Sequence, residues 1–181
     1  MKKVFVLASM AAMVFTACSK DDSGVTTGAN NTNNTMTVKN QTDMNFMMGV
    51  AMSNSAEVSL GQLASTRGTN AGVRQFGQMM VNHHTMAQSM LRALGDSVQS
   101  RVPDSMSSQM QALAQRLSTL TGRTFDTAYM NSQVMSHQMT LGIFQSEISG
   151  GQNMWIKNFA SRNVGMIQQH LTMADSIRRT L

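Results

Sequence analysis

Four side chains that can bind a transition metal interrupt otherwise apolar stripes along this sequence. The octapeptide MVNHHTMA at 80–87 places His84 on the apolar side of a helix. Glu57, His137 and His170 occupy the equivalent place in three other stripes, which are built from three- and four-residue steps. One acid and three imidazoles suit a single Zn²⁺, Fe²⁺, Mn²⁺ or Cu²⁺ ion. The pattern therefore predicts a metal site made of these four residues.

The elements that must position these side chains are helices. The chain contains one proline and is rich in Leu, Met, Gln and Ala, a composition that favours helix. Asp43 and Asn70 are expected to cap the first two helices, and Pro103–Asp104 to begin a short third. The chain is thus predicted to be all-α: a ferritin-like four-helix bundle with a long crossover that carries a short extra helix. The five helical segments span about 43–67, 70–98, 103–121, 124–149 and 152–181.

The stripes of these helices predict which residues face the core. Each stripe has one metal-capable residue near its middle. The first contains Phe46, Val50, Ser53, Glu57, Leu60 and Ala64, and the second contains Gly77, Met80, His84, Ala87, Leu91 and Leu94. The fourth segment gives Val134, His137, Leu141, Phe144 and Ile148; the last gives Ile156, Phe159, Asn163, Met166, His170, Ala174 and Ile177.

A single long crossover brings the four candidate ligands to one height. A connecting helix of about 18 residues is ~27 Å long, enough to run the length of the bundle. Plain up-and-down threading scatters the four positions more widely. Measured from the end at residue 68, the crossover topology places Glu57 at ~17 Å, His84 at ~22 Å, His137 at ~20 Å and His170 at ~15 Å.

The donor set differs from that of di-iron proteins, which use Glu-x-x-His motifs to bridge two metals. The residues three positions before each histidine are Val81, Val134 and Ile167, so iron storage and di-iron chemistry are disfavoured. Four ligands would close a structural site, whereas Glu57 in a supporting role would leave a three-histidine site with an open position. The alternative without metal is a buried Glu–His hydrogen-bond network that fixes helix register.

Neighbouring side chains supply further candidates. His83 is expected to face outward or to support a ligand. Met80, Met166 and Met173 share helix faces with His84 or His170, and their thioethers could help to hold Cu(I). Removal of a signal leaves seventeen of the twenty methionines. We expect most to fill the core, although a methionine-rich surface can also absorb oxidants. Glu147 is expected on a solvated helix face.

The N-terminus predicts an envelope lipoprotein. Residues 1–17 combine two lysines with a short apolar run and read as a signal peptide. The ending FTAC resembles a lipobox, which makes Cys18 the acylated residue and the membrane lipid its anchor. Residues 18–41 are polar enough to form a disordered tether, and 42–181 form the bundle domain. Ser19 and the following residues resemble the start of outer-membrane lipoproteins, including surface-exposed ones. Cys18 is the only cysteine, so no intrachain disulfide forms.

Composition and motifs narrow the function. The net charge of +5 falls to +3 when Lys2 and Lys3 leave with the signal, and no basic cluster indicates nucleic acid. No nucleophile elbow or glycine-rich phosphate loop is present, and no organic cofactor is expected. A binding module is favoured over a mononuclear metalloenzyme or a structural interaction protein. A protein partner and an oligomeric state are not indicated.

A resemblance covers nearly the whole predicted domain, about residues 42–178. It rests on the segments NSAEVSLGQLA, VRQFGQMMVNHHTMA, TGRTFDTAYMNSQVMSHQMTLGIFQSE and KNFASRNVGMIQQHLTMA. These resemble the bacterial envelope proteins grouped as domain of unknown function 4142, which are assigned a ferritin-like helical bundle. The resemblance implies that Glu57, His84, His137 and His170 are the polar core. His83 stands where that family usually has Asp, and the family has no assigned activity.

Overall fold

The computed structural model describes residues 40–181, so the predicted signal peptide, Cys18 and most of the predicted tether lie outside the described residues. Within 40–181 there are five helices and no strand, which confirms the all-α prediction. The helices are α1 (Gln41–Arg67), α2 (Ala71–Ser97), α3 (Ser108–Ser118), α4 (Gly122–Gly150) and α5 (Met154–Arg178).

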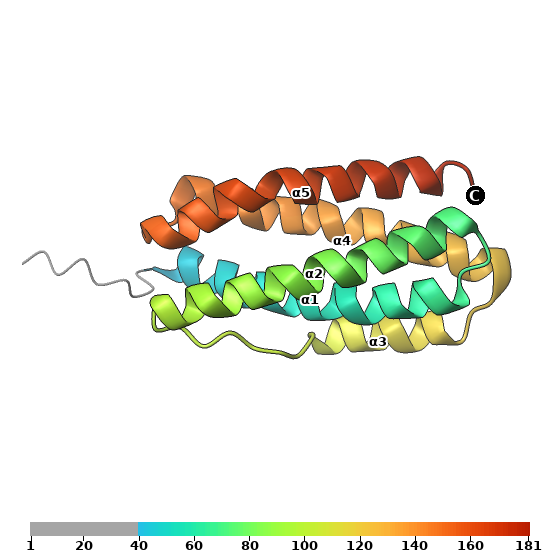
Figure 1. Ribbon diagram of the computed structural model, residues 1–181, viewed down its shortest axis with the longest axis horizontal. Coiled ribbons are helices and arrows are strands. Elements are labelled where there is room, and N and C mark those ends of the chain that lie inside the picture. Colours follow the sequence, from blue (N-terminus) through green and yellow to red (C-terminus); the bar gives the residue numbers. More distant parts are fainter. Residues whose placement is uncertain (1–39) are drawn as a thin grey trace, which may run out of the picture. The chain divides into compact units, whose positions relative to one another are not determined.

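The four long helices pack as a bundle (Figure 1). Helix α1 lies between α2 and α4, and α5 lies between α4 and α2. Helices α1 and α4 are antiparallel, because the Asn40 side chain donates to the Gly150 carbonyl (3.0 Å) and the Ser136 hydroxyl donates to Glu57 (2.7 Å). The connection from α2 to α4 passes from one end of these helices to the other and carries α3 (Figure 1). The predicted long crossover is therefore present.

The helix starts differ from two of the predicted caps. Asn40, rather than Asp43, caps α1, and Asp43 is the third helical residue and closes a capping box with Asn40. Asn70 caps α2 as predicted. The predicted helix start at Pro103–Asp104 is wrong, because α3 begins only after its cap, Ser107. The carbonyl of Pro103 and the carboxylate of Asp104 instead accept hydrogen bonds from the Gln88 amide of α2.

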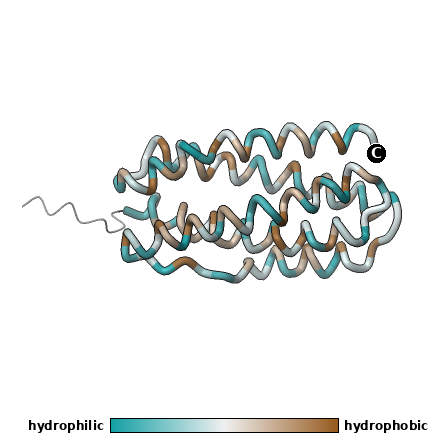
Figure 2. Tube along the Cα trace, in the orientation of Figure 1, coloured by the Kyte–Doolittle hydropathy of each residue, from teal (hydrophilic) through white to brown (hydrophobic). Residues whose placement is uncertain are grey.

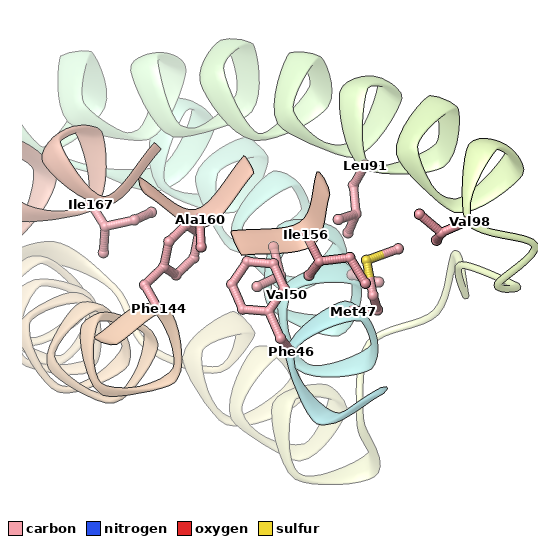
Figure 3. Packing of buried hydrophobic residues seen from close by; sticks show 10 residues of the cluster. Phe46, Met47, Val50, Leu91, Val98, Phe144, Ile156, Ala160 and Ile167 are labelled. Carbon is pink, nitrogen blue, oxygen red and sulfur yellow. The ribbon is translucent and has the colours of Figure 1, made fainter. Parts of the chain in front are cut away.

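Two hydrophobic clusters fill the bundle, one toward each end. The first surrounds Phe46, whose ring meets Phe144 edge-on at a centroid distance of 5.0 Å (Figure 3). The second surrounds Phe76 and Tyr129. Figure 2 shows hydrophobic residues interspersed with hydrophilic ones along each long helix, as expected when one side of a helix faces the core. Buried polar residues are found on the helix stretches between the two clusters: Asn54, Glu57, His84, Gln88, Gln133, His137, Thr140 and His170.

The buried faces of α1 and α4 are rotated slightly from the predicted stripes. Asn54 is buried where Ser53 was expected, and Ser53 is only half-buried. On α4, Gln133 and Thr140 are buried, while Val134 and Leu141 are half-buried. These helices therefore turn amide and hydroxyl groups, rather than aliphatic ones, toward the middle of the bundle.

Glu147 is fully buried, which corrects the prediction that it faces solvent. Its carboxyl lies close enough to Asp43 for the charge of that residue to act on it. Burial, followed by the Asp43 charge, raises the pKa of Glu147 to about 7. A Cβ at Gly151 would overlap the Glu147 carboxyl, so glycine is required there. Glu147 thus lies buried beside an acidic residue where the start of α1 meets the end of α4.

This pair predicts a pH-dependent stability. Because the fold raises the pKa of Glu147 from 4.5 to about 7, its stabilisation is complete below pH 4.5 and is lost as the pH rises to about 7. The free energy of unfolding should therefore fall across this range. We expect Glu147→Gln, which cannot ionise, to remove most of that slope in urea titrations at pH 5, 6, 7 and 8. An unchanged slope in the variant would contradict the assignment.

Candidate metal centre

Three of the four predicted ligands meet inside the bundle. His84 of α2, His137 of α4 and His170 of α5 each offer one ring nitrogen, and the three nitrogens lie within 4.8 Å of one another. All three side chains are at most 2% exposed. The ring centroids are 5.3 to 5.9 Å apart. Small side-chain rotations would bring these nitrogens to the distances that a metal ion of ~2.0–2.1 Å metal–nitrogen bond length requires.

Hydrogen bonds at the opposite ring nitrogens set the tautomers of His84 and His137. The Nδ1–H of His84 donates to the Asn54 side-chain oxygen (2.8 Å), and the Nδ1–H of His137 donates to the Gln133 carbonyl (2.9 Å). Asn54 is oriented for this role because its own amide donates to Gln88. In the neutral rings, each Nε2 therefore carries a lone pair. Neither Nε2 has a hydrogen-bond partner among residues 40–181.

His83 is the hydrogen-bond partner of the third histidine, His170. Its Nδ1 lies 2.9 Å from Nε2 of His170, and the two rings are nearly parallel, with centroids 5.1 Å apart. In the tautomer of His170 that carries its proton on Nε2, this nitrogen donates to His83 and Nδ1 of His170 keeps a lone pair. That Nδ1 is buried and unpartnered. Half-buried His83 therefore contacts one of the three converging histidines, and its support of a metal ligand stays a prediction.

Burial favours the neutral form of two of the three histidines, His84 and His170. Desolvation lowers the pKa of His84 well below its usual value, and the neighbouring histidines lower it further. The same causes lower the pKa of His170 to about 3. A neutral imidazole is the form that binds metal. His84 and His170 are therefore in the ligating state at neutral pH.

Glu57 is not one of the converging group. It is buried on α1, where one carboxylate oxygen accepts from Ser136 and the other has no hydrogen-bond partner. Two neighbouring residues nevertheless connect Glu57 to the histidine cluster. Asn54, one turn before it, contacts His84, and Ser136 directly precedes His137. Burial, and then the charge of Glu57, raises the pKa of Tyr129 well above its usual value.

The three candidate methionines occupy different environments. Met80 is fully buried in the hydrophobic cluster around Phe76, and Met166 is half-buried against the other cluster. Met173 is 43% exposed. Met80 and Met166 thus have the core-filling role that was expected of most methionines.

Sequence reasoning missed the amide residues that hold the site. Asn54 and Gln88 form a chain from His84 to the α2–α3 connection, where Gln88 donates to Asp104 and Arg92 pairs with the same carboxylate. A signal was present, since Asn54 lies four residues after Val50 and Gln88 lies four after His84. Both positions continue an apolar stripe.

These features define the class: an all-helical bundle protein with a buried three-histidine cluster that can hold a metal ion. The chain belongs to the family described as Domain of unknown function (DUF4142), whose model matches residues 27–177. The resemblance noted in the sequence is therefore confirmed. No curated protein and no solved structure matches the chain significantly.

The contact between His83 and His170 predicts a graded effect on metal affinity. Replacement His83→Ala removes the hydrogen-bond partner of His170 but leaves all three converging histidines in place. Loss of such a supporting partner typically weakens metal binding about 10–100-fold. We expect this reduction in a competition titration with a chromophoric Zn²⁺ chelator. His83→Gln, which can still accept a hydrogen bond, should recover part of the affinity; equal affinity in wild type and His83→Ala would contradict the role.

Proposed function

We propose that this protein binds a single transition-metal ion through His84, His137 and His170. The observation that carries the proposal is the set of three buried ring nitrogens that have no hydrogen-bond partner, namely Nε2 of His84, Nε2 of His137 and Nδ1 of His170. Leaving one buried polar atom unsatisfied costs about 1–3 kcal/mol. An ion at their point of convergence satisfies all three. Hydrogen bonds at the other ring nitrogens are also typical of metal-binding histidines.

The donor set favours a borderline divalent ion. Imidazole suits Zn²⁺, Fe²⁺, Cu²⁺ and, less strongly, Mn²⁺. Three neutral ligands leave the full charge of the ion uncompensated, and Glu57 is the buried carboxylate nearest in the network of contacts around them. We propose that Glu57 either balances this charge from nearby or moves into the fourth coordination position. Its free oxygen supports both roles.

We further propose that the bundle is ferritin-like and is held in the cell envelope by lipid on Cys18. The long crossover between two antiparallel helix pairs supports the topology. The lysines, apolar run and FTAC ending of the first eighteen residues support the anchor. None of the helices in residues 40–181 is long and apolar enough to cross a membrane. The role that we propose is to handle metal ions, or to take part in the response to envelope stress, at an outer-membrane surface.

Elemental analysis with a Co²⁺ titration tests the metal proposal. Protein expressed without residues 1–17 should bind one Co²⁺ per chain and develop the visible absorption of a four- or five-coordinate centre. The triple variant His84→Ala, His137→Ala, His170→Ala should bind none at the same concentrations, while retaining helical circular dichroism. Equal Co²⁺ binding by the folded triple variant, or no binding of any divalent ion by wild type, would overturn the proposal.

A further inference from the structure

The hydrophobic side chains on the surface of residues 40–181 are almost all methionines. The large hydrophobic residues that are exposed comprise eight methionines and one tryptophan. Every Leu, Ile, Val and Phe in this part of the chain is buried or half-buried. The surface therefore excludes aliphatic side chains of similar size and accepts thioethers. Core filling does not explain methionines that lie outside the core.

Six of these eight methionines form pairs with a fixed spacing. Each pair is separated by four residues, and the pairs lie on three different helices: Met44 and Met48 on α1, Met86 and Met90 on α2, and Met135 and Met139 on α4. All six are 41% to 61% exposed. Absorption of oxidants needs only exposed sulfur and requires no spacing. The repeated interval therefore indicates a use in which two sulfurs act together.

An i, i+4 pair on a helix suits a soft metal ion. The two Cβ atoms lie about 5–6 Å apart, and each sulfur is carried by a flexible, unbranched side chain. With metal–sulfur bonds of about 2.3 Å, two sulfurs that share one ion are at most ~4.6 Å apart. Both side chains can reach this separation without any change in the helix. Thioethers select Cu(I) over hard divalent ions.

We propose that these three methionine pairs are surface sites for a soft monovalent cation, Cu(I). The pairs are distinct from the histidine centre, because all six methionines are exposed whereas the three histidines are buried. Solvent molecules complete the coordination of an ion held by two thioethers, so binding is weaker and exchange faster than at a buried site. Three such sites on separate helices allow one chain to carry several ions on its surface.

Methyl NMR of protein labelled at the methionine methyl groups tests this directly, with Ag⁺ in chloride-free buffer as a redox-stable substitute for Cu(I). We expect the six paired methyl resonances to shift at Ag⁺ concentrations at least tenfold lower than those needed for Met154 and Met173. These two methionines are also exposed but have no methionine four residues away. Zn²⁺ should leave the paired resonances unmoved.

Met48→Leu supplies the decisive variant, because leucine has similar volume and helix propensity. Met44 then loses its partner, and its apparent affinity for Ag⁺ should fall at least tenfold, while Met86 and Met135 respond as before. Met173→Leu is the matched control and should change none of the six. The proposal is overturned when Met44 responds equally in Met48→Leu and wild type, or when Met154 and Met173 respond together with the pairs.

Discussion

Replacement His137→Leu should abolish the stabilisation of the bundle by Zn²⁺ while leaving the metal-free protein within about 1 kcal/mol of wild type. His137 makes one hydrogen bond, to the Gln133 carbonyl, and holds one unsatisfied buried nitrogen. Leucine, which has a similar volume, loses this hydrogen bond but also removes the unsatisfied nitrogen. Wild type at a free Zn²⁺ concentration of 100 times Kd gains about 2.7 kcal/mol. The variant, with two converging histidines, should gain almost nothing.

Urea unfolding with and without Zn²⁺ measures both effects. Met130→Leu is the matched control, since Met130 is fully buried on the same helix and offers no ring nitrogen; it should keep the full response to Zn²⁺. The experiment also separates the metal site from a hydrogen-bond network that fixes helix register. A network predicts that His137→Leu is strongly destabilised without metal and that Zn²⁺ stabilises neither protein.

Replacement Gly77→Ala should destabilise the bundle by about 1–3 kcal/mol. A Cβ at Gly77 would lie 2.8 Å from the Gly61 carbonyl oxygen and 2.9 Å from the backbone nitrogen of Ser65. These are backbone atoms of α1, so contact can be relieved only when α1 and α2 move apart. Such a movement would also disturb the approach of Asn54 on α1 to His84 on α2. Affinity for Zn²⁺ should therefore fall together with stability.

Gly165→Ala gives the opposite sign and is the control. Gly165 lies within α5, and a Cβ there would meet nothing within 4 Å. Alanine is favoured over glycine in a helix by about 0.8–1 kcal/mol, so this variant should be more stable than wild type. Thermal melting of both variants checks the prediction. Stabilisation by both replacements would show that helix propensity, rather than close packing of α1 and α2, decides the outcome.

The sequence predicted the helices and the three-histidine cluster because both depend on local spacing. Stripes of apolar residues identified the four long helices, and a polar residue in each stripe identified His84, His137 and His170. Glu57 was buried as predicted, but membership of the ligand set depends on side-chain direction across a helix pair. A stripe fixes the face of a helix only to within about one residue. The half-buried positions of Val134 and Leu141 show the same limit.

Contacts between distant residues were not predictable from spacing. Asn54 and His84 meet because α1 and α2 are antiparallel at one register, and His83 reaches His170 across two helices that are far apart in the chain. Glu147 was expected to face solvent because carboxylates are rarely buried. It is buried near Asp43, which lies more than one hundred residues earlier in the chain. Such pairings follow from tertiary packing, which a single sequence does not show.

The band of buried polar residues between the two hydrophobic clusters has a consequence for folding cooperativity. Hydrophobic packing stabilises each end of the helices, whereas the middle contains buried polar atoms whose lone pairs are not satisfied by a hydrogen bond. A metal ion bound to the three histidines would link α2, α4 and α5 at this level, so the two ends of the bundle would unfold cooperatively. Hydrogen exchange of backbone amides in the middle of these helices should then slow sharply in the metal-bound protein. Exchange toward either end of the bundle should slow far less.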